Sequence, residues 1–301
     1  MTKLMLLAIL PLTSYLTRCS RAKTVVFEKR NFETVTATPA TPPSDEILIE
    51  ISTEYGNMKC RLYNETPKHR DNFVSLIEKN YFDSLLFHRV INNFVIQGGD
   101  PDSRNAKKDI LLGDGGPGYT LPAEIIPEKY YHKKGALAAA RESDDKNPAK
   151  ESSGSQFYIV QGRIQDDASL IKNEKRINRT IMQHITDSLL SLPANILLKE
   201  KWTRIKNQDK KGDSLVIFQR KIDSLAEPLY LKSKKYQIPE AQRSVYKRIG
   251  GTPHLDTHYT VFGEVYEGLE VLDKIITTKT DNNDRPVKDI RMKIRIIRKA
   301  K

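Results

Sequence analysis

The sequence predicts a mainly β fold that is interrupted by an α-helical segment. Apolar and polar residues alternate with a period of two over 47–52, and a turn containing Gly56 separates this stretch from a second one over 58–63. Such alternation is typical of two strands joined as a hairpin. Between 163 and 250 apolar residues recur at steps of three and four, as in helices, and strand-like patterns return afterwards. A β fold that resumes after a helical stretch indicates an insertion.

The remaining elements are predicted by the same patterns. Pro67 near the start and an apolar face ending before Asn80 predict a helix. Pro193 and Gly212 divide the helical insertion into segments. Short apolar stretches predict further strands over 87–91, 94–99, 135–140, 156–160, 259–262 and 290–297, and an amphipathic stretch predicts a helix over 269–276.

The N-terminus has the pattern of an export signal. An apolar run over 4–12 follows Lys3 and is shorter than the ~20 residues needed to cross a bilayer, which favours a signal peptide over 1–19. Leu16 three residues before Cys19 resembles a bacterial lipoprotein signal, although Arg18 replaces the usual small residue. We therefore expect a lipid on Cys19, a Pro/Thr-rich tether over 20–45, and a location in the bacterial cell envelope. Cleavage elsewhere, with Cys19 an incidental thiol, is the alternative.

The excess positive charge lies mostly on the insertion. The chain carries a formal charge of +12, and residues 164–249 hold 18 Lys and Arg against 10 Asp and Glu. No zinc-ligand spacing or recognition helix accompanies the charge, so we expect no nucleic-acid partner. His254 and His258 on one strand face have no further ligand cluster, so we expect no metal. The two cysteines exclude a disulfide framework.

The insertion, residues 164–249, has two interpretations. Its apolar stripes favour a helical subdomain packed beside the β fold, because such stripes mostly face a core. Deleting the segment is then expected to leave the activity of the β fold nearly intact. The alternative is a docking surface for client proteins or for an anionic membrane.

Four blocks, in this order, resemble the cyclophilins: 87–100 (FHRVINNFVIQGGD), 138–141 (AAAR), 154–159 (GSQFYI) and 261–265 (VFGEV). The resemblance covers 46–163 and 250–301. It implies a closed eight-stranded antiparallel barrel capped by helices, and a peptidyl-prolyl cis-trans isomerase that acts on proline-containing unfolded or partly folded proteins. It implies no cofactor, because rotation about a peptide bond breaks no bond.

The resemblance also assigns roles to individual residues. Arg89 is the expected donor to the proline nitrogen, with Gln97 holding its guanidinium, and His88 is expected to be a hydrogen-bonded structural residue. The expected substrate-binding residues are Phe94, Val95, Ala140, Arg141, Gln156, Tyr158, His254, Leu255 and Tyr259. Ala140 and Arg141 are expected to bind substrate through backbone groups.

Two positions depart from the best-known eukaryotic members, which carry a tryptophan where this chain has His254 and a methionine where it has Val95. Neither change removes the arginine or the apolar pocket, so catalysis is expected to survive. The alternative to an enzyme is a module that binds proline-containing segments without isomerising them.

Overall fold

The computed structural model describes residues 42–208 and 212–299. The predicted signal peptide, Cys19 and the tether up to residue 41 lie outside the described residues, so these stay predictions. Among the helices that are described, we find none long and apolar enough to cross a membrane.

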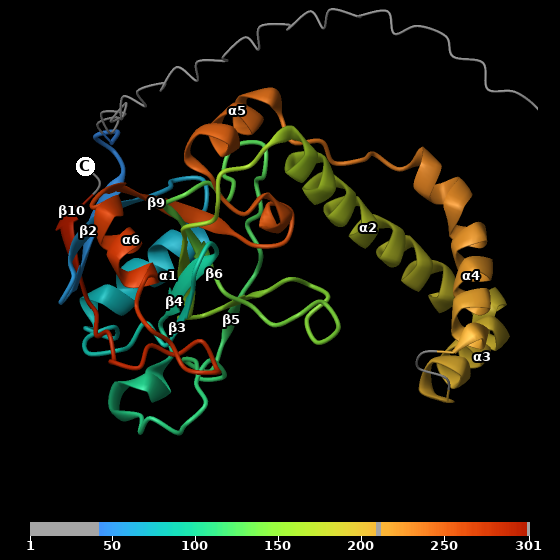
Figure 1. Ribbon diagram of the computed structural model, residues 1–301, viewed down its shortest axis with the longest axis horizontal. Coiled ribbons are helices and arrows are strands. Elements are labelled where there is room, and N and C mark those ends of the chain that lie inside the picture. The colour runs from blue at the N-terminus through green and yellow to red at the C-terminus, as the bar shows by residue number, and fades with distance from the viewer. Residues whose placement is uncertain (1–41, 209–211, 300–301) are drawn as a thin grey trace, which may run out of the picture. The chain divides into compact units, whose positions relative to one another are not determined.

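The strands and helices that the sequence predicts occur in the predicted order, whereas two short strands over 120–121 and 152–153 were not predicted (Figure 1). The strands are β1 (Ile47–Thr53), β2 (Gly56–Leu62), β3 (Arg89–Ile91), β4 (Val95–Gly98), β5 (Thr120–Leu121), β6 (Ala136–Ala139), β7 (Ser152–Ser153), β8 (Phe157–Val160), β9 (Val261–Glu267) and β10 (Lys293–Arg298). The α-helices are α1 (Pro67–Glu78), α2 (Asp167–Ser191), α3 (Ile196–Gln208), α4 (Asp213–Lys232), α5 (Glu240–Ile249) and α6 (Leu269–Ile276). Short 3-10 helices are η1 (Pro101–Asn105), η2 (Pro193–Asn195) and η3 (Pro253–Leu255).

Eight strands form one antiparallel sheet in the order β10-β1-β2-β9-β6-β8-β4-β3, and β5 pairs with β7 separately. The prediction of a closed barrel is wrong, because β3 and β10 are the edges of this sheet and do not pair with each other. Only the segments that precede them come together: Phe87 N–H donates to the carbonyl of Ile290 at 2.9 Å, and Met292 N–H donates to that of Leu85 at 2.8 Å. The sheet is therefore an open half-barrel.

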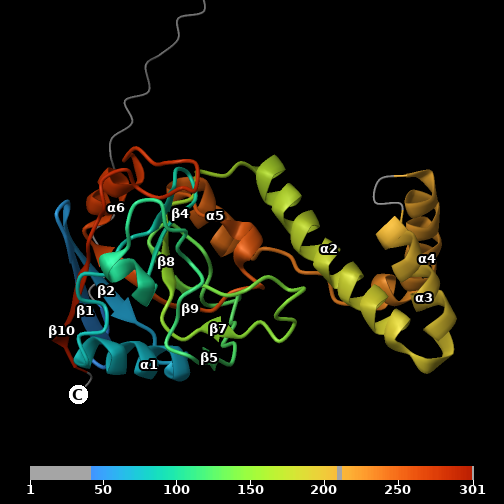
Figure 2. The ribbon, with the colours of Figure 1, turned by 90° about the horizontal axis from the view of Figure 1, so that it is seen from below.

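The main core lies inside the curved sheet. The alternating residues Ile49 and Ile51 of β1 are fully buried there, as are Phe157 and Ile159 of β8. Helices α1 and α6 add their apolar faces to the same core, and Figure 2 shows them at opposite ends of the sheet. A second apolar cluster, which includes Val95, lies on the other side of the sheet.

The insertion separates β8 from β9. Helices α2, α3 and α4 enclose a small core of Leu190, Phe218 and Ile222, while α5 packs through Tyr246 in a cluster that lies nearer the sheet. The two ends of the insertion meet, because Gly251 N–H donates to the carbonyl of Arg163 at 3.1 Å. The insertion can therefore leave and rejoin the β fold at one place.

Gly251 provides a test of how tightly this junction is packed. Its φ of +151° is unusual for residues with a side chain, and an added Cβ would lie 2.3 Å from the His132 carbonyl oxygen and 2.6 Å from the Tyr246 ring. We expect Gly251→Ala to lower the free energy of unfolding by about 3 kcal/mol. Gly116→Ala is the matched control, because nothing lies within 4 Å of its added Cβ. Urea unfolding measures both, and equal stabilities of the two variants would refute the close packing.

Candidate active site

Two glutamine side chains, Gln156 and Gln97, orient Arg89, the first residue of β3. The Gln156 side-chain amide donates to the carbonyls of Gly113 and Gly115, at 2.7 Å each. Both of its hydrogens are thus used, so its oxygen faces Gln97, whose Nε2 donates to it at 3.0 Å. The Gln97 oxygen then accepts from Arg89 Nη1 at 3.3 Å. This series of hydrogen bonds runs from the loop at Gly113 and Gly115 through Gln156 and Gln97 to the Arg89 guanidinium.

Strand register explains why these side chains meet. Arg89 lies directly opposite Gln97 in the β3–β4 pair. Along β4, Ile96 points into the main core, whereas Val95 and Gln97 point to the other side. The Arg89 side chain stays 41% exposed, so it can still contact a ligand, and its Nε lies 3.6 Å from Asp284 Oδ2.

Beside Arg89 lies a cavity of about 190 Å³, which we call the proline pocket after the role that the sequence predicts. Its lining consists of Arg89, Phe94, Val95, Gln97, Ala140, Arg141, Tyr158, Leu255 and Tyr259. The Tyr158 and Tyr259 rings meet edge to face, with centroids 5.9 Å apart. The predicted apolar residues are thus brought together from four separate segments of the chain.

His254 and Gln156, which we also expected to contact substrate, are placed differently. His254 stands beside the proline pocket, where its ring stacks on Phe94 with centroids 5.9 Å apart. His254 therefore packs against Phe94, a residue of the pocket wall, and does not itself line the cavity. Gln156 lines the larger neighbouring cavity.

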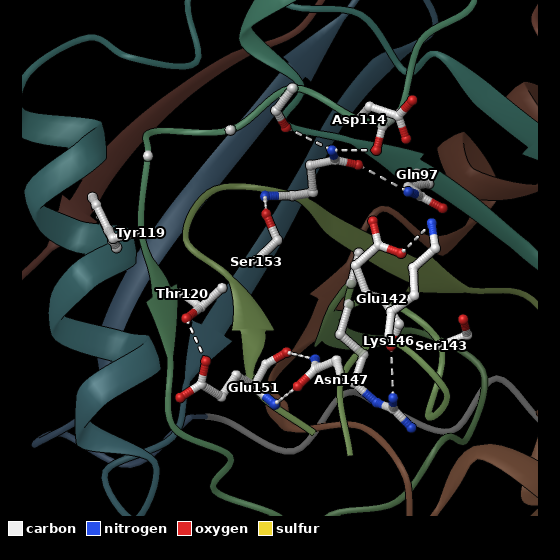
Figure 3. A pocket seen from close by; sticks show the side chains of 17 residues that line it. Gln97, Asp114, Tyr119, Thr120, Glu142, Ser143, Lys146, Asn147, Glu151 and Ser153 are labelled. Atoms are coloured by element: carbon white, nitrogen blue, oxygen red, sulfur yellow. Dashed lines mark hydrogen bonds and ion pairs between the residues drawn. The ribbon is translucent and has the colours of Figure 1, made fainter. Parts of the chain in front are cut away.

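That neighbouring cavity has a volume of about 990 Å³ and shares Gln97, Ala140 and Arg141 with the proline pocket. Figure 3 shows its mostly polar lining, in which Glu142 faces Lys146 and Asn147 faces Glu151. Tyr119 and Thr120 stand on its far side. The cavity is continuous with the site around Arg89 and suits polar groups.

Part of the Ala140 backbone is already used within the fold. Its N–H donates to the Gln156 carbonyl at 3.0 Å, and its own carbonyl accepts from Ser153 N–H at 2.8 Å. The Ala140 N–H is therefore not available to a ligand, whereas the carbonyl oxygen keeps a second lone pair, so the backbone role of Ala140 and Arg141 stays a prediction. The residue contributes to the site as part of the cavity wall.

Arg141 has a structural role that the sequence did not indicate. Its guanidinium lies 4.7 Å from the Tyr259 ring centre, and it donates to the carbonyls of His258 and Glu142, at 2.7 Å each, and to Asp144 at 2.5 Å. The side chain is only 3% exposed. Arg141 thus fixes one aromatic wall of the proline pocket.

The histidines near the site are held neutral. Burial, and secondarily the charge of Arg176, lowers the pKa of His254 to about 3. Burial likewise lowers the pKa values of His258 and His88 to about 4. His88 is buried as expected, and its hydrogen bonding stays a prediction.

His254 and His258 do not alternate on a strand. His254 belongs to η3, and His258 follows in the next turn, with its Nε2 3.2 Å from the Thr180 hydroxyl of α2. Within 42–208 and 212–299 no three His, Cys, Asp or Glu side chains group as metal ligands would.

Four polar residues around the site were not expected from the sequence. Asp284 beside Arg89 comes from a loop almost 200 residues further along the chain. Asp256 accepts from His132, which lies far earlier in the chain, and from Tyr246 of the insertion, ten residues before it. The only local signal was a carboxylate between two histidines in the 254–258 segment, and it could not identify partners from other segments.

An arginine fixed beside an apolar slot, on the outer side of a curved antiparallel sheet, is the arrangement expected of the prolyl isomerases that the sequence resembles. The family described as cyclophilin type peptidyl-prolyl cis-trans isomerase/CLD matches residues 48–175 and 242–296, together more than half of the chain. The chain belongs to this family, which confirms the predicted enzyme class. Residues 176–241 lie outside the match.

Individual relatives are similar over most of their length. Proteins of Staphylococcus haemolyticus (strain JCSC1435) and Staphylococcus aureus (strain COL), provisionally described as peptidyl-prolyl cis-trans isomerases, are 28% and 27% identical over 247 residues. These alignments cover 82% and 81% of this chain and 88% of each relative. A solved cyclophilin type isomerase of Cryptosporidium parvum is 21% identical with a TM-score of 0.48, covering 84% of this chain and 98% of that one.

The lowered histidine pKa values predict an acid-sensitive fold. In the unfolded chain the histidine pKa is near 6.5, so these side chains become protonated between pH 7 and 5. In the folded protein His88, His254 and His258 stay neutral over the same range, because their pKa values are lower. The free energy of unfolding should therefore fall as the pH is lowered through this window. Urea unfolding at several pH values measures the slope.

His258→Gln should reduce this slope, whereas His184→Gln, which changes an exposed histidine of α2, should not. A free energy of unfolding that is constant or rises on acidification would contradict the lowered pKa values of these buried histidines.

Proposed function

We propose that this chain accelerates the rotation of X-Pro bonds by donating a hydrogen bond from Arg89 to the proline nitrogen while the proline ring occupies the proline pocket. The observation that carries the proposal is the fixed direction of the Arg89 guanidinium at the edge of this pocket, set by Gln97 and Gln156. The proposed substrates are proline-containing segments of unfolded or partly folded proteins.

The chemistry requires no bond to break. Resonance in the planar amide produces a barrier of ~18–20 kcal/mol, and this resonance is lost when the bond twists. The nitrogen then becomes pyramidal and gains a lone pair that can accept a hydrogen bond. A donor that is always charged and already oriented binds this twisted state better than either planar isomer, which lowers the barrier.

The larger cavity supports the same proposal. It begins at Gln97 and Ala140, where the proline pocket ends, so a peptide whose proline occupies the pocket can place a neighbouring side chain there. Its carboxylates, lysine and amides favour polar side chains over apolar ones. Holding the peptide on both sides of the rotating bond is what allows binding energy to favour the twisted amide.

Replacement of Arg89 tests the mechanism. A hydrogen bond from a charged donor contributes about 1.5–3 kcal/mol, so Arg89→Ala should lower kcat/KM for a proline peptide by roughly 10- to 150-fold. Arg89→Lys should retain part of the activity. Arg204→Ala, an exposed arginine of α3, is the matched control and should be fully active.

A protease-coupled peptide assay and the refolding of a proline-limited protein supply the two rates. Arg89→Ala at the wild-type rate would refute the role of the guanidinium. A wild type that binds proline peptides without accelerating either reaction would favour the alternative, a binding module without catalysis.

We further propose that the protein is exported and held in the bacterial cell envelope by a lipid on Cys19, and that its clients are exported proteins. The support is the apolar run over 4–12 with Leu16 three residues before Cys19, followed by a Pro/Thr-rich segment. A tethered isomerase would meet polypeptides as they emerge into the envelope.

Mass spectrometry of the mature protein tests this location. We expect the N-terminal residue to be Cys19 and to carry diacylglycerol, and Cys19→Ala should release the protein into the soluble fraction. An unmodified N-terminus at another residue would refute lipidation.

A further inference from the structure

A buried chain of hydrogen bonds connects the insertion to the wall of the proline pocket. It begins at Tyr246 of α5, whose hydroxyl lies 2.8 Å from both carboxylate oxygens of Asp256. The same carboxylate accepts from the backbone N–H of His132 at 2.8 Å. Tyr246, Asp256 and His132 are at most 1% exposed, so their polar groups depend on partners within the protein.

The chain continues from His132 to Tyr158. His132 Nδ1 lies 3.0 Å from Asp256 Oδ1, and a carboxylate can only accept, so Nδ1 carries the hydrogen. In the neutral ring Nε2 is then an acceptor, and the Tyr158 hydroxyl, 2.9 Å away, donates to it. Asp256 thus sets the tautomer of His132, which in turn sets the direction of the Tyr158 hydroxyl.

Fixing this hydroxyl fixes a wall of the pocket. The Tyr158 ring stacks on His132 with an interplanar angle of 17° and meets Tyr259 nearly perpendicularly, at 82°. A ring anchored at its far end cannot tilt without breaking the hydrogen bond to His132. The width of the slot between Tyr158 and the other lining residues therefore depends on the buried chain.

Tyr246 is itself held rigidly by both ends of the insertion. Its carbonyl accepts from Gln165 N–H, at the start of the insertion, and from Gly250 N–H, at its end, at 3.1 Å each. The lack of a side chain at Gly251 lets the Tyr246 ring approach the backbone there. The hydroxyl of Tyr246 is thus presented to Asp256 from a fixed position.

We propose that Tyr246 is a positioning residue of the proline pocket, which acts through Asp256 and His132 to hold the Tyr158 ring in place for the substrate. The inference rests on the proposed function, because it assigns a role in the same pocket. It makes the last helix of the insertion part of the substrate site, although no residue of that helix lines the cavity.

A double-mutant cycle in the full chain tests the proposal. Tyr246→Phe removes the hydroxyl, and we expect kcat/KM to fall by about 3- to 10-fold and the Kd of an Ala-Pro-containing peptide, measured by NMR titration, to rise by a similar factor. In a Tyr158→Phe background, where there is no hydroxyl to position, the same Tyr246→Phe change should alter both quantities by less than twofold.

Tyr230→Phe is the matched control, because it removes a tyrosine hydroxyl elsewhere on the insertion, and it should change neither quantity. His132→Gln breaks the chain at another point and should show the same coupling to Tyr158→Phe, so the proposal stays testable if Tyr246→Phe folds poorly. A merely structural Tyr246 would lower the melting temperature of both backgrounds equally and leave peptide binding by the folded fraction unchanged.

The proposal is overturned if Tyr246→Phe binds and isomerises the peptide like the wild type, or if the losses of the two single variants multiply in the double variant. A wild type without isomerase activity would refute the proposed function instead. The peptide Kd values would still decide the role of Tyr246, so the two failures are distinguishable.

Discussion

The carbonyls of Gly113 and Gly115 take both amide hydrogens of Gln156, and the polar half of the site follows from this pair of hydrogen bonds. With those hydrogens used, Gln156 can only accept from Gln97, and Gln97 can only accept from Arg89. The guanidinium is thus oriented before a substrate arrives, so little reorganisation is needed as the amide twists. The loop that contains Gly113 and Gly115 thus acts by supplying these two oxygens.

The insertion is both an addition to the β fold and a part of it. Because Arg163 and Gly251 are hydrogen-bonded neighbours, the helices α2 to α4 can be accommodated without changing the register of β8 or β9. Tyr246, however, satisfies a buried carboxylate of the β fold. Removing 164–249 would remove this donor to Asp256. That the insertion can be deleted without loss of activity stays a prediction, and the proposed role of Tyr246 argues against it for the last helix.

Much of the site could be predicted because its determinants are local. The cyclophilin-like motif over 87–100 identified Val95 and Gln97 as site residues, and strand alternation along β4 places both on one side and Ile96 on the other. Contacts between distant segments could not be predicted in this way. His132 meets Asp256 across 124 positions, and no pattern in either segment indicates the other. The prediction of a closed barrel was wrong for a similar reason. Whether the two edge strands pair depends on the twist accumulated over the whole sheet.

The two series of hydrogen bonds that orient Arg89 and Tyr158 meet at strand β8. Gln156, just before the strand, ends the polar chain from Arg89, and Tyr158, two residues later, ends the chain from Tyr246. Phe157 between them points into the main core. Because side chains alternate along a strand, a register shift of one residue would exchange Phe157 with both site residues and break both chains at once. The same packing that buries Phe157 therefore places the oriented arginine and the aromatic wall on the same side of the sheet.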